Sequence, residues 1–293
     1  MVDASRLTAL LDDSMDSGVS IPFNTSAGDA YGVLWRMREL EGWDSPELDE
    51  GADAKSGADG LWDVENFYGG RTLSIGGVFT APSYEEREAA GYRLAQAVPR
   101  DRLVAFTLNE TTPKWVRARR SGRLKVRPVG ELHGEYSISM LAPDPLKYGG
   151  AAVTASLSVA TPGAGLAPPW TPPVLVPASS SGLDQAVMTN TGIYSSPPVI
   201  TIHGPGASVS VYNYATSLLL AYDLTLGASD FLTVDVAAGV ALLNGTAQRP
   251  PAPGSCVTSK FVMAPGDNLI RIFGTLTEVT PPSADISFYS AWT

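Results

Sequence analysis

The sequence has 293 residues, enough for two domains of ordinary size, and its 44% hydrophobic and 17% charged content excludes wholesale disorder. The formal net charge of −10 argues against a protein that coats nucleic acid, and the longest apolar run is too short to span a membrane. The single cysteine excludes an intrachain disulfide and a cysteine-based zinc cage, and fits a protein made in a reducing cytoplasm.

The first half of the chain predicts a mixed α+β domain. Residues 1–30 match no pattern that we can place. Ser83 and Glu86 form an S-x-x-E capping box, and apolar residues recur at helical spacing from there to Pro99, so we expect a helix between them. Ser121-Gly122 separates two alternating runs and predicts a hairpin turn. Strands are expected at Tyr31–Arg38, Arg71–Thr80, Leu103–Leu108, Lys114–Arg120, Arg123–Arg127 and Glu135–Leu141.

Two charged clusters lie within this half. Acidic residues crowd positions 44–65 in Gly- and Ala-rich sequence, where a solvated loop is the first interpretation and a pair of glycosidase carboxylates the alternative. A basic cluster follows at positions 114–127. In the predicted hairpin, five of its side chains share one face. Three interpretations of this face are open: it faces solvent, it contacts an acidic surface of a neighbouring copy, or it binds nucleic acid. The five are Arg117, Arg119, Arg123, Lys125 and Arg127, and their expected acidic partners in a subunit interface include Asp44, Glu47 and Asp49.

A proline-rich segment separates the two halves of the sequence. Residues 151–181 contain six prolines and no charged residue, and proline at this density blocks helices and central strands. We therefore expect a semi-rigid connector between an N-terminal domain of residues 1–150 and a C-terminal domain of residues 182–293. In the second domain, alternating apolar residues are broken by turn signals such as Asn244-Gly245, which predicts a β-sandwich. The expected fold class is mainly β.

No catalytic or metal-binding constellation is found in the sequence. His133 and His203 are the only histidines, and neither lies near a nucleophile motif, so structural or surface roles are expected for both. The glycine-rich spots lack the phosphate-loop pattern, and Cys256 is interpreted as a small core residue. We expect no cofactor, no metal ion and no enzymatic activity.

The turn motifs and their order resemble those of siphophage distal tail proteins. In the second half, the matching residues are Asn190, Gly192, Pro198, Gly204, Gly227, Asp230, Asp235, Asn244, Gly245, Phe261, Pro265, Gly266, Asn268 and Trp292. The first half is similar through the segments GGRTLSIGGVFTAPSYEER, PKWVRAR and ISMLAPDPLKYG. The resemblance runs from about Tyr31 to the end of the sequence.

The resemblance implies a non-enzymatic virion protein at the tip of a phage tail. Distal tail proteins form a hexameric ring with their N-terminal domains, let DNA pass, and carry a galectin-like C-terminal sandwich. The implied partners are copies of the chain itself, the tail tube protein and the tail-tip or receptor-binding proteins, with no sequence-specific nucleic acid and no membrane insertion. The alternative is a carbohydrate-binding module that contacts a glycan of the host cell wall, through the aromatic residues Tyr212, Tyr214 and Tyr222.

Overall fold

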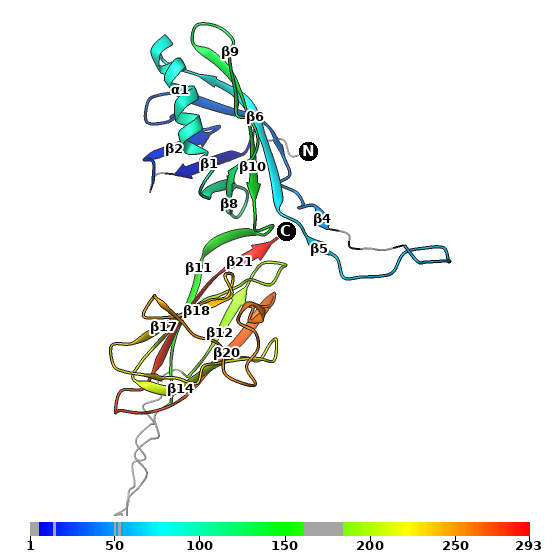
Figure 1. Cartoon of the computed structure of the whole chain (residues 1–293). Helices are drawn as coiled ribbons and strands as arrows, with labels where there is room; N and C mark the ends of the chain where they lie inside the picture. Colours follow the sequence, from blue (N-terminus) through cyan, green and yellow to red (C-terminus); the bar gives the residue numbers. More distant parts are fainter. Residues whose placement is uncertain (1–5, 14–15, 50, 52–53, 161–183) are drawn as a thin grey trace, which may run out of the picture. The chain divides into compact units, whose positions relative to one another are not determined.

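The protein consists of two compact units, which divide after Gly150. The computed structural model describes residues 6–13, 16–49, 51, 54–160 and 184–293. Each unit has its own hydrophobic core. In the described part of the chain nearly all regular structure is β-strand, and α1 (Tyr84–Ala97) is the only α-helix (Figure 1). The prediction of a mainly β fold is confirmed.

Seven strands of the first unit close into a barrel. Following hydrogen-bonded neighbours, the order β8-β7-β1-β2-β3-β6-β10 returns to β8, because β10 pairs with β8 as well as with β6. Apolar side chains fill the interior, where the rings of Trp35 and Phe79 lie 4.9 Å apart. The strands are β1 (Thr8–Asp13), β2 (Val19–Phe23), β3 (Leu34–Glu41), β6 (Arg71–Thr80), β7 (Val104–Asn109), β8 (Lys114–Arg120) and β10 (His133–Ala142), with β9 (Lys125–Pro128) beside β10.

The first thirty residues supply two of the barrel strands. β1 lies between β2 and β7, and it contributes Ala9 and Leu11 to the core, while β2 contributes Ile21 and Phe23. Residues 1–30, which match no pattern in the sequence, thus contain two strands of the barrel. In the sequence, each of these strands is a short alternating run. Without its neighbours in the barrel, such a run cannot be distinguished from a loop.

Helix α1 begins and ends where the sequence predicts. Ser83 is its N-cap, and Ser83 Oγ accepts a hydrogen bond from the Glu86 amide at 3.2 Å. The Glu86 carboxylate does not complete the capping box, because it accepts a hydrogen bond from Arg93 Nη1 at 2.8 Å. The buried residues of the helix are Ala90, Arg93, Leu94 and Ala97.

The hairpin predicted at Ser121-Gly122 does not form. β8 pairs with β7 and, at its end, with β10, whereas β9 pairs only with β10 among the described strands. Arg119 lies opposite Leu141 and Arg127 lies opposite Glu135, so β8 and β9 follow each other along the same side of β10. A strand interrupted by a glycine of positive φ has the same alternation as a hairpin, which is why the sequence pattern did not separate the two.

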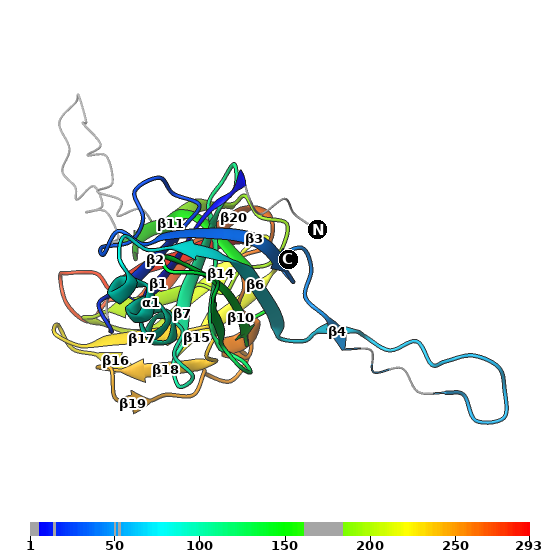
Figure 2. The same ribbon diagram turned by 90° about the horizontal axis from the view of Figure 1, so that it is seen from above.

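A long excursion leaves the barrel between β3 and β6. Near its base β4 (Leu48–Asp49) pairs with β5 (Phe67–Tyr68), and further out Ala54 and Leu61 form an isolated bridge. Figures 1 and 2 both show this segment running away from the barrel. The described residues between Leu48 and Tyr68 are called the arm below.

The second unit is a β-sandwich. One sheet has the order β19-β18-β17-β13-β21-β11, and the other has the order β12-β20-β14-β15, with β16 beside β14. Buried apolar residues of both sheets form its core. The elements are β11 (Lys147–Ser158), β12 (Gln185–Asn190), β13 (Val199–His203), β14 (Gly206–Asn213), β15 (Leu218–Ala221), β16 (Thr225–Leu226), β17 (Phe231–Asp235), β18 (Val240–Leu243), β19 (Ala247–Gln248), the 3-10 helix η2 (Thr258–Lys260), β20 (Gly266–Thr275) and β21 (Ser283–Trp292).

The expected connector does not begin at residue 151. Residues 151–158 continue β11, and this stretch can form a strand because the first proline of the segment is Pro162. Leu157 belongs to the core of the second unit. The rest of the expected connector, residues 161–183, lies outside the described residues.

The turn motifs of the second unit have structural roles. Asn244 and Gly245 join β18 to β19 with φ values of 51° and 73°, which confirms the predicted tight hairpin. Asn213 Nδ2 donates a hydrogen bond to Asn268 Oδ1 at 3.1 Å, and Asn190 Nδ2 donates to the carbonyl of Met263 at 3.0 Å. All three asparagines are buried, so the motif residues tie loops to the sandwich core.

Candidate interaction surfaces

The side chains that support most enzyme and metal chemistry lie apart from one another. Among the described residues, no group of three or more His, Cys, Asp or Glu could hold a metal ion. His133 Nδ1 lies 3.0 Å from Thr80 Oγ1, and His203 Nε2 lies 3.1 Å from Asp285 Oδ2. Burial raises the pKa of the Cys256 thiol, which disfavours a reactive thiolate. The described helices include none that is long and apolar enough to cross a membrane.

Exposed basic side chains follow β8 and β9 along the outside of the barrel. Arg117 and Arg119 project outward from β8, and Lys125 and Arg127 project outward from β9. Arg123 is exposed between the two strands. No described acidic residue forms an ion pair with any of the five. The interrupted strand thus places four of the five predicted residues on one outer face without the hairpin.

The three acidic residues assigned to the interface lie at the root of the arm. Asp44 and Glu47 are exposed between β3 and β4, and Asp49 is exposed in β4. They form no ion pair with the basic residues of β8 and β9 within the described chain. Their pairing with a neighbouring copy therefore stays a prediction.

The arm exposes large apolar side chains. Every residue from Leu61 to Phe67 is exposed, and residues 62–66 belong to no strand. The exposed fraction is 60% for Trp62 and 64% for Phe67, and Val64 is exposed between them. Apolar groups gathered on one projecting segment mark an interaction surface rather than the scattered apolar exposure of an ordinary protein surface.

Two buried cations hold the root of the arm. Arg71, at the start of β6, donates from Nη1 to the carbonyls of Gly42 at 2.8 Å and Trp43 at 2.7 Å, and from Nε to the carbonyl of Pro145 at 2.9 Å. Lys147 Nζ donates to the same Trp43 carbonyl at 3.0 Å. Burial, helped by the nearby charge of Arg71, lowers the pKa of Lys147 to about 8. The segment that leads into the arm is therefore fixed by hydrogen bonds to its backbone.

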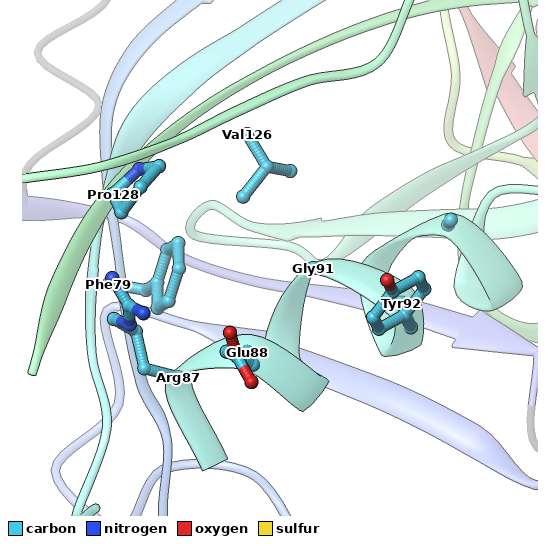
Figure 3. Close-up of a pocket in the computed structure, with 8 residues that line it drawn as sticks. Phe79, Arg87, Glu88, Gly91, Tyr92, Val126 and Pro128 are labelled. Atoms are coloured by element: carbon cyan, nitrogen blue, oxygen red, sulfur yellow. The ribbon is translucent and has the colours of Figure 1, made fainter. Parts of the chain in front are cut away.

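A groove lies between α1 and β9 (Figure 3). Its volume is about 480 Å³, and Val126 and Pro128 of β9 face the helix across it. Gly91 of α1 lies beside Val126, since a Cβ there would stand 3.4 Å from Val126 Cγ1, in van der Waals contact. Tyr92, which is 77% exposed, lines the same groove. The groove is lined by apolar side chains and by the charged Arg87 and Glu88 of α1. It opens beside an edge strand, since β9 pairs only with β10 among the described strands.

Aromatic side chains also mark the outer face of one sheet of the sandwich. The rings of Tyr212 and Tyr214 are 4.7 Å apart and nearly perpendicular. Tyr212 lies opposite Arg271 of β20, and the guanidinium of Arg271 forms an ion pair with Asp184 at 2.9 Å. Tyr222, in contrast, is 1% exposed. Its inclusion among glycan-binding residues is wrong, because a buried ring offers no platform for a sugar.

Comparisons with known proteins find similarity in the fold. No protein-family model matches the chain, and no curated protein matches it. The Dit protein (gp 19.1) of phage SPP1, described as a paradigm of the hub adsorption apparatus in phages that infect Gram-positive bacteria, has a similar structure with a TM-score of 0.57. That likeness covers 86% of this chain and 91% of the Dit chain at 15% identity. The chain has the fold of a phage tail hub protein.

Two further structures of this hub fold come from the baseplate of phage P2 in its activated conformation. A chain of the baseplate with Ca matches with a TM-score of 0.51 at 10% identity, covering 99% of this chain and 98% of its own. A chain of the baseplate with Sr matches with a TM-score of 0.50 at 9% identity, covering 97% of each chain. The resemblance to distal tail proteins that the turn motifs indicate is thereby confirmed at the level of the fold.

Proposed function

We propose that this protein is the distal tail hub of a phage, a hexameric ring that joins the tail tube to the tail-tip proteins and lets DNA pass. The observation that carries the proposal is the extent of the likeness to the Dit protein of phage SPP1, which covers 86% of this chain and includes residues of both units. A likeness confined to the sandwich would fit many β-sandwich proteins with unrelated roles.

The surfaces of the first unit support a role in assembly. A closed ring with cyclic symmetry needs two different complementary patches on each subunit, so that the contact repeats around the circle. The exposed basic side chains of β8 and β9 and the acidic, apolar arm are two such patches, of opposite charge. The net charge of −10 also suits a conduit for DNA, because a strongly basic chain would retain phosphate.

The test is the size and symmetry of the full-length protein in solution. Mass photometry over a concentration series is expected to show a species of six 30.8-kDa chains, and negative-stain images of that species are expected to show a six-fold ring. If the ring needs its partner, addition of the tail tube protein is expected to produce it. A protein that stays monomeric at high concentration, with and without that partner, contradicts the hub proposal.

A second proposal is that the sandwich binds a glycan of the host cell wall. It rests on the exposed Tyr214 and the half-buried Tyr212 beside the Arg271–Asp184 ion pair, because an aromatic ring next to polar groups suits the stacking of a sugar ring. Co-sedimentation of the full chain with purified cell walls tests it. Tyr214→Ala is expected to abolish co-sedimentation and Tyr289→Ala, at another exposed tyrosine of the second unit, is expected to leave it unchanged. Equal binding of both variants contradicts this proposal.

A further inference from the structure

The arm carries a two-residue alternation that no partner within the described chain uses. Along residues 61–65 the sequence reads Leu-Trp-Asp-Val-Glu, so an extended backbone would place Trp62 and Val64 on one side and Asp63 and Glu65 on the other. All of these side chains are exposed, and residues 62–66 pair with no strand that the structure describes. The Trp62 ring contacts the Lys55 ammonium at 5.5 Å, a contact within the arm itself.

Strand β9 carries the matching alternation with the opposite charge. Val126 and Pro128 point into the groove against α1, whereas Lys125 and Arg127 point to the other face of the strand. β9 pairs with β10 on one side, and its second edge pairs with no described strand. An unpaired edge of this kind presents backbone N–H and C=O groups that another strand can use.

We propose that residues 61–65 of one copy add as a strand to the free edge of β9 of a second copy. The inference rests on the proposed ring and names the contact that builds it. In such an addition, side chains of neighbouring strands that point to the same face lie side by side. Trp62 and Val64 then enter the groove beside Val126 and Pro128, and Asp63 and Glu65 lie beside Lys125 and Arg127.

The alternation makes the pairing specific. A shift of one residue would turn Asp63 and Glu65 toward Val126 and Pro128, and Trp62 toward Lys125 and Arg127. Only one parity of register therefore matches apolar with apolar and acidic with basic side chains along β9. Folding the arm back onto β9 of its own chain does not occur in the structure, where the arm runs away from the barrel (Figures 1 and 2). The proposal therefore commits to a second copy of this chain, whose arm offers the matching alternation and charge, as the occupant of the edge.

Cysteine cross-linking tests the face that each side chain occupies. In the full-length Cys256→Ser background, Val64→Cys combined with Val126→Cys is expected to give a ladder of covalent oligomers on oxidation, because both positions face the groove. The matched control combines Asp63→Cys with Val126→Cys, which lie on opposite faces, and is expected to give little or no ladder. Equal ladders from the two pairs overturn the proposed alignment of faces.

Charge reversal tests the energetics of the same contact. Asp63→Lys with Glu65→Lys is expected to weaken assembly roughly tenfold or more, because two attractive cross-strand pairs become repulsive. Adding Lys125→Glu and Arg127→Glu to the same chain is expected to restore it. Asp267→Lys with Glu278→Lys changes the charge by the same amount at exposed positions of the second unit and is expected to weaken assembly less than threefold. Because Arg127 lies opposite Glu135, urea unfolding of every variant checks that the barrel is intact.

The outcomes separate this inference from the hub proposal. If six-fold rings form but the groove-facing pair gives no ladder and charge reversal in the arm changes nothing, the strand addition is wrong and the hub proposal stands. If the wild-type chain never leaves the monomeric state, with or without the tail tube protein, both are wrong.

Discussion

Replacement of Lys147 with methionine is expected to stabilise the first unit at neutral pH. Lys147 is 6% exposed, and burial together with the charge of Arg71 lowers its pKa from 10.5 to about 8. Between these two pH values the unfolded chain binds more protons at this residue than the folded chain does. Stability therefore rises with pH from about 8 toward 10.5, and the cost of burying the ammonium group is fully present below pH 8.

The structure sets the size of the effect. The difference between a pKa of 10.5 and one of about 8 corresponds to about 3 kcal/mol. Removing the ammonium group also removes its hydrogen bond to the Trp43 carbonyl, which contributes about 1 kcal/mol. That carbonyl keeps Arg71 Nη1 as a donor at 2.7 Å, so no buried acceptor loses its last partner. We therefore expect Lys147→Met to stabilise the protein by about 1–3 kcal/mol at pH 7.

Urea unfolding followed by tryptophan fluorescence at pH 7, 8, 9 and 9.5 measures this effect. The wild-type free energy of unfolding is expected to approach that of the variant as pH rises. The series stops below pH 10 because burial raises the pKa of Tyr136 and Tyr148, and deprotonation of these tyrosines in the unfolded chain destabilises the fold at higher pH. Lys125→Met, at an exposed position of the same unit, is the control. A Lys147→Met variant that is less stable at pH 7, with a deficit independent of pH, refutes the reasoning.

Three further predictions concern the turn motifs and the two surfaces. Gly192→Ala is expected to destabilise the second unit by about 2–4 kcal/mol in urea unfolding, because a Cβ there would lie 2.0 Å from the Ala291 carbonyl oxygen. Arg119→Glu with Arg123→Glu is expected to weaken the ring in mass photometry while the monomer stays folded, and wild-type assembly is expected to weaken as salt rises, since exposed ion pairs are screened. Tyr222→Phe is expected to cost about 1 kcal/mol of stability through loss of its contact with Thr258 Oγ1, and to leave any cell-wall binding unchanged.

The sequence predicts those elements whose signals are local. The capping residue Ser83 and the closing Pro99 bracket α1 correctly, and Asn244-Gly245 marks a true hairpin, because caps and tight turns depend on residues within a few positions of each other. β1 and β2 could not be predicted from the sequence, because their burial depends on β7 and β3, which follow later in the chain. Ser121-Gly122 was misassigned because the partner of both flanking strands is β10, which local alternation does not identify.

Of the candidate surfaces, too, only those with a local signal can be predicted from the sequence. The basic side chains of β8 and β9 could be found from spacing alone, because strand alternation fixes their common face whether or not a hairpin forms. The groove could not be found in this way, since its walls are α1 and β9, which are distant in the sequence. Trp62 and Val64 carried no signal within an acidic loop; their significance comes from the absence of any strand or core against which residues 62–66 pack in the described chain.

The buried cations at the root of the arm and the exposed residues along it belong to one arrangement. Burying Arg71 and Lys147 carries a desolvation cost, which is seen in the lowered pKa of both groups. What they do supply is direction, since together they fix the carbonyls of Gly42 and Trp43, from which the arm departs. A strand that must reach the edge of another copy in one register gains from a fixed departure point, because less conformational entropy is then lost on docking. The two buried cations thus cost stability at the root of the arm, and the fixed departure point that they provide favours docking of residues 61–65 in one register.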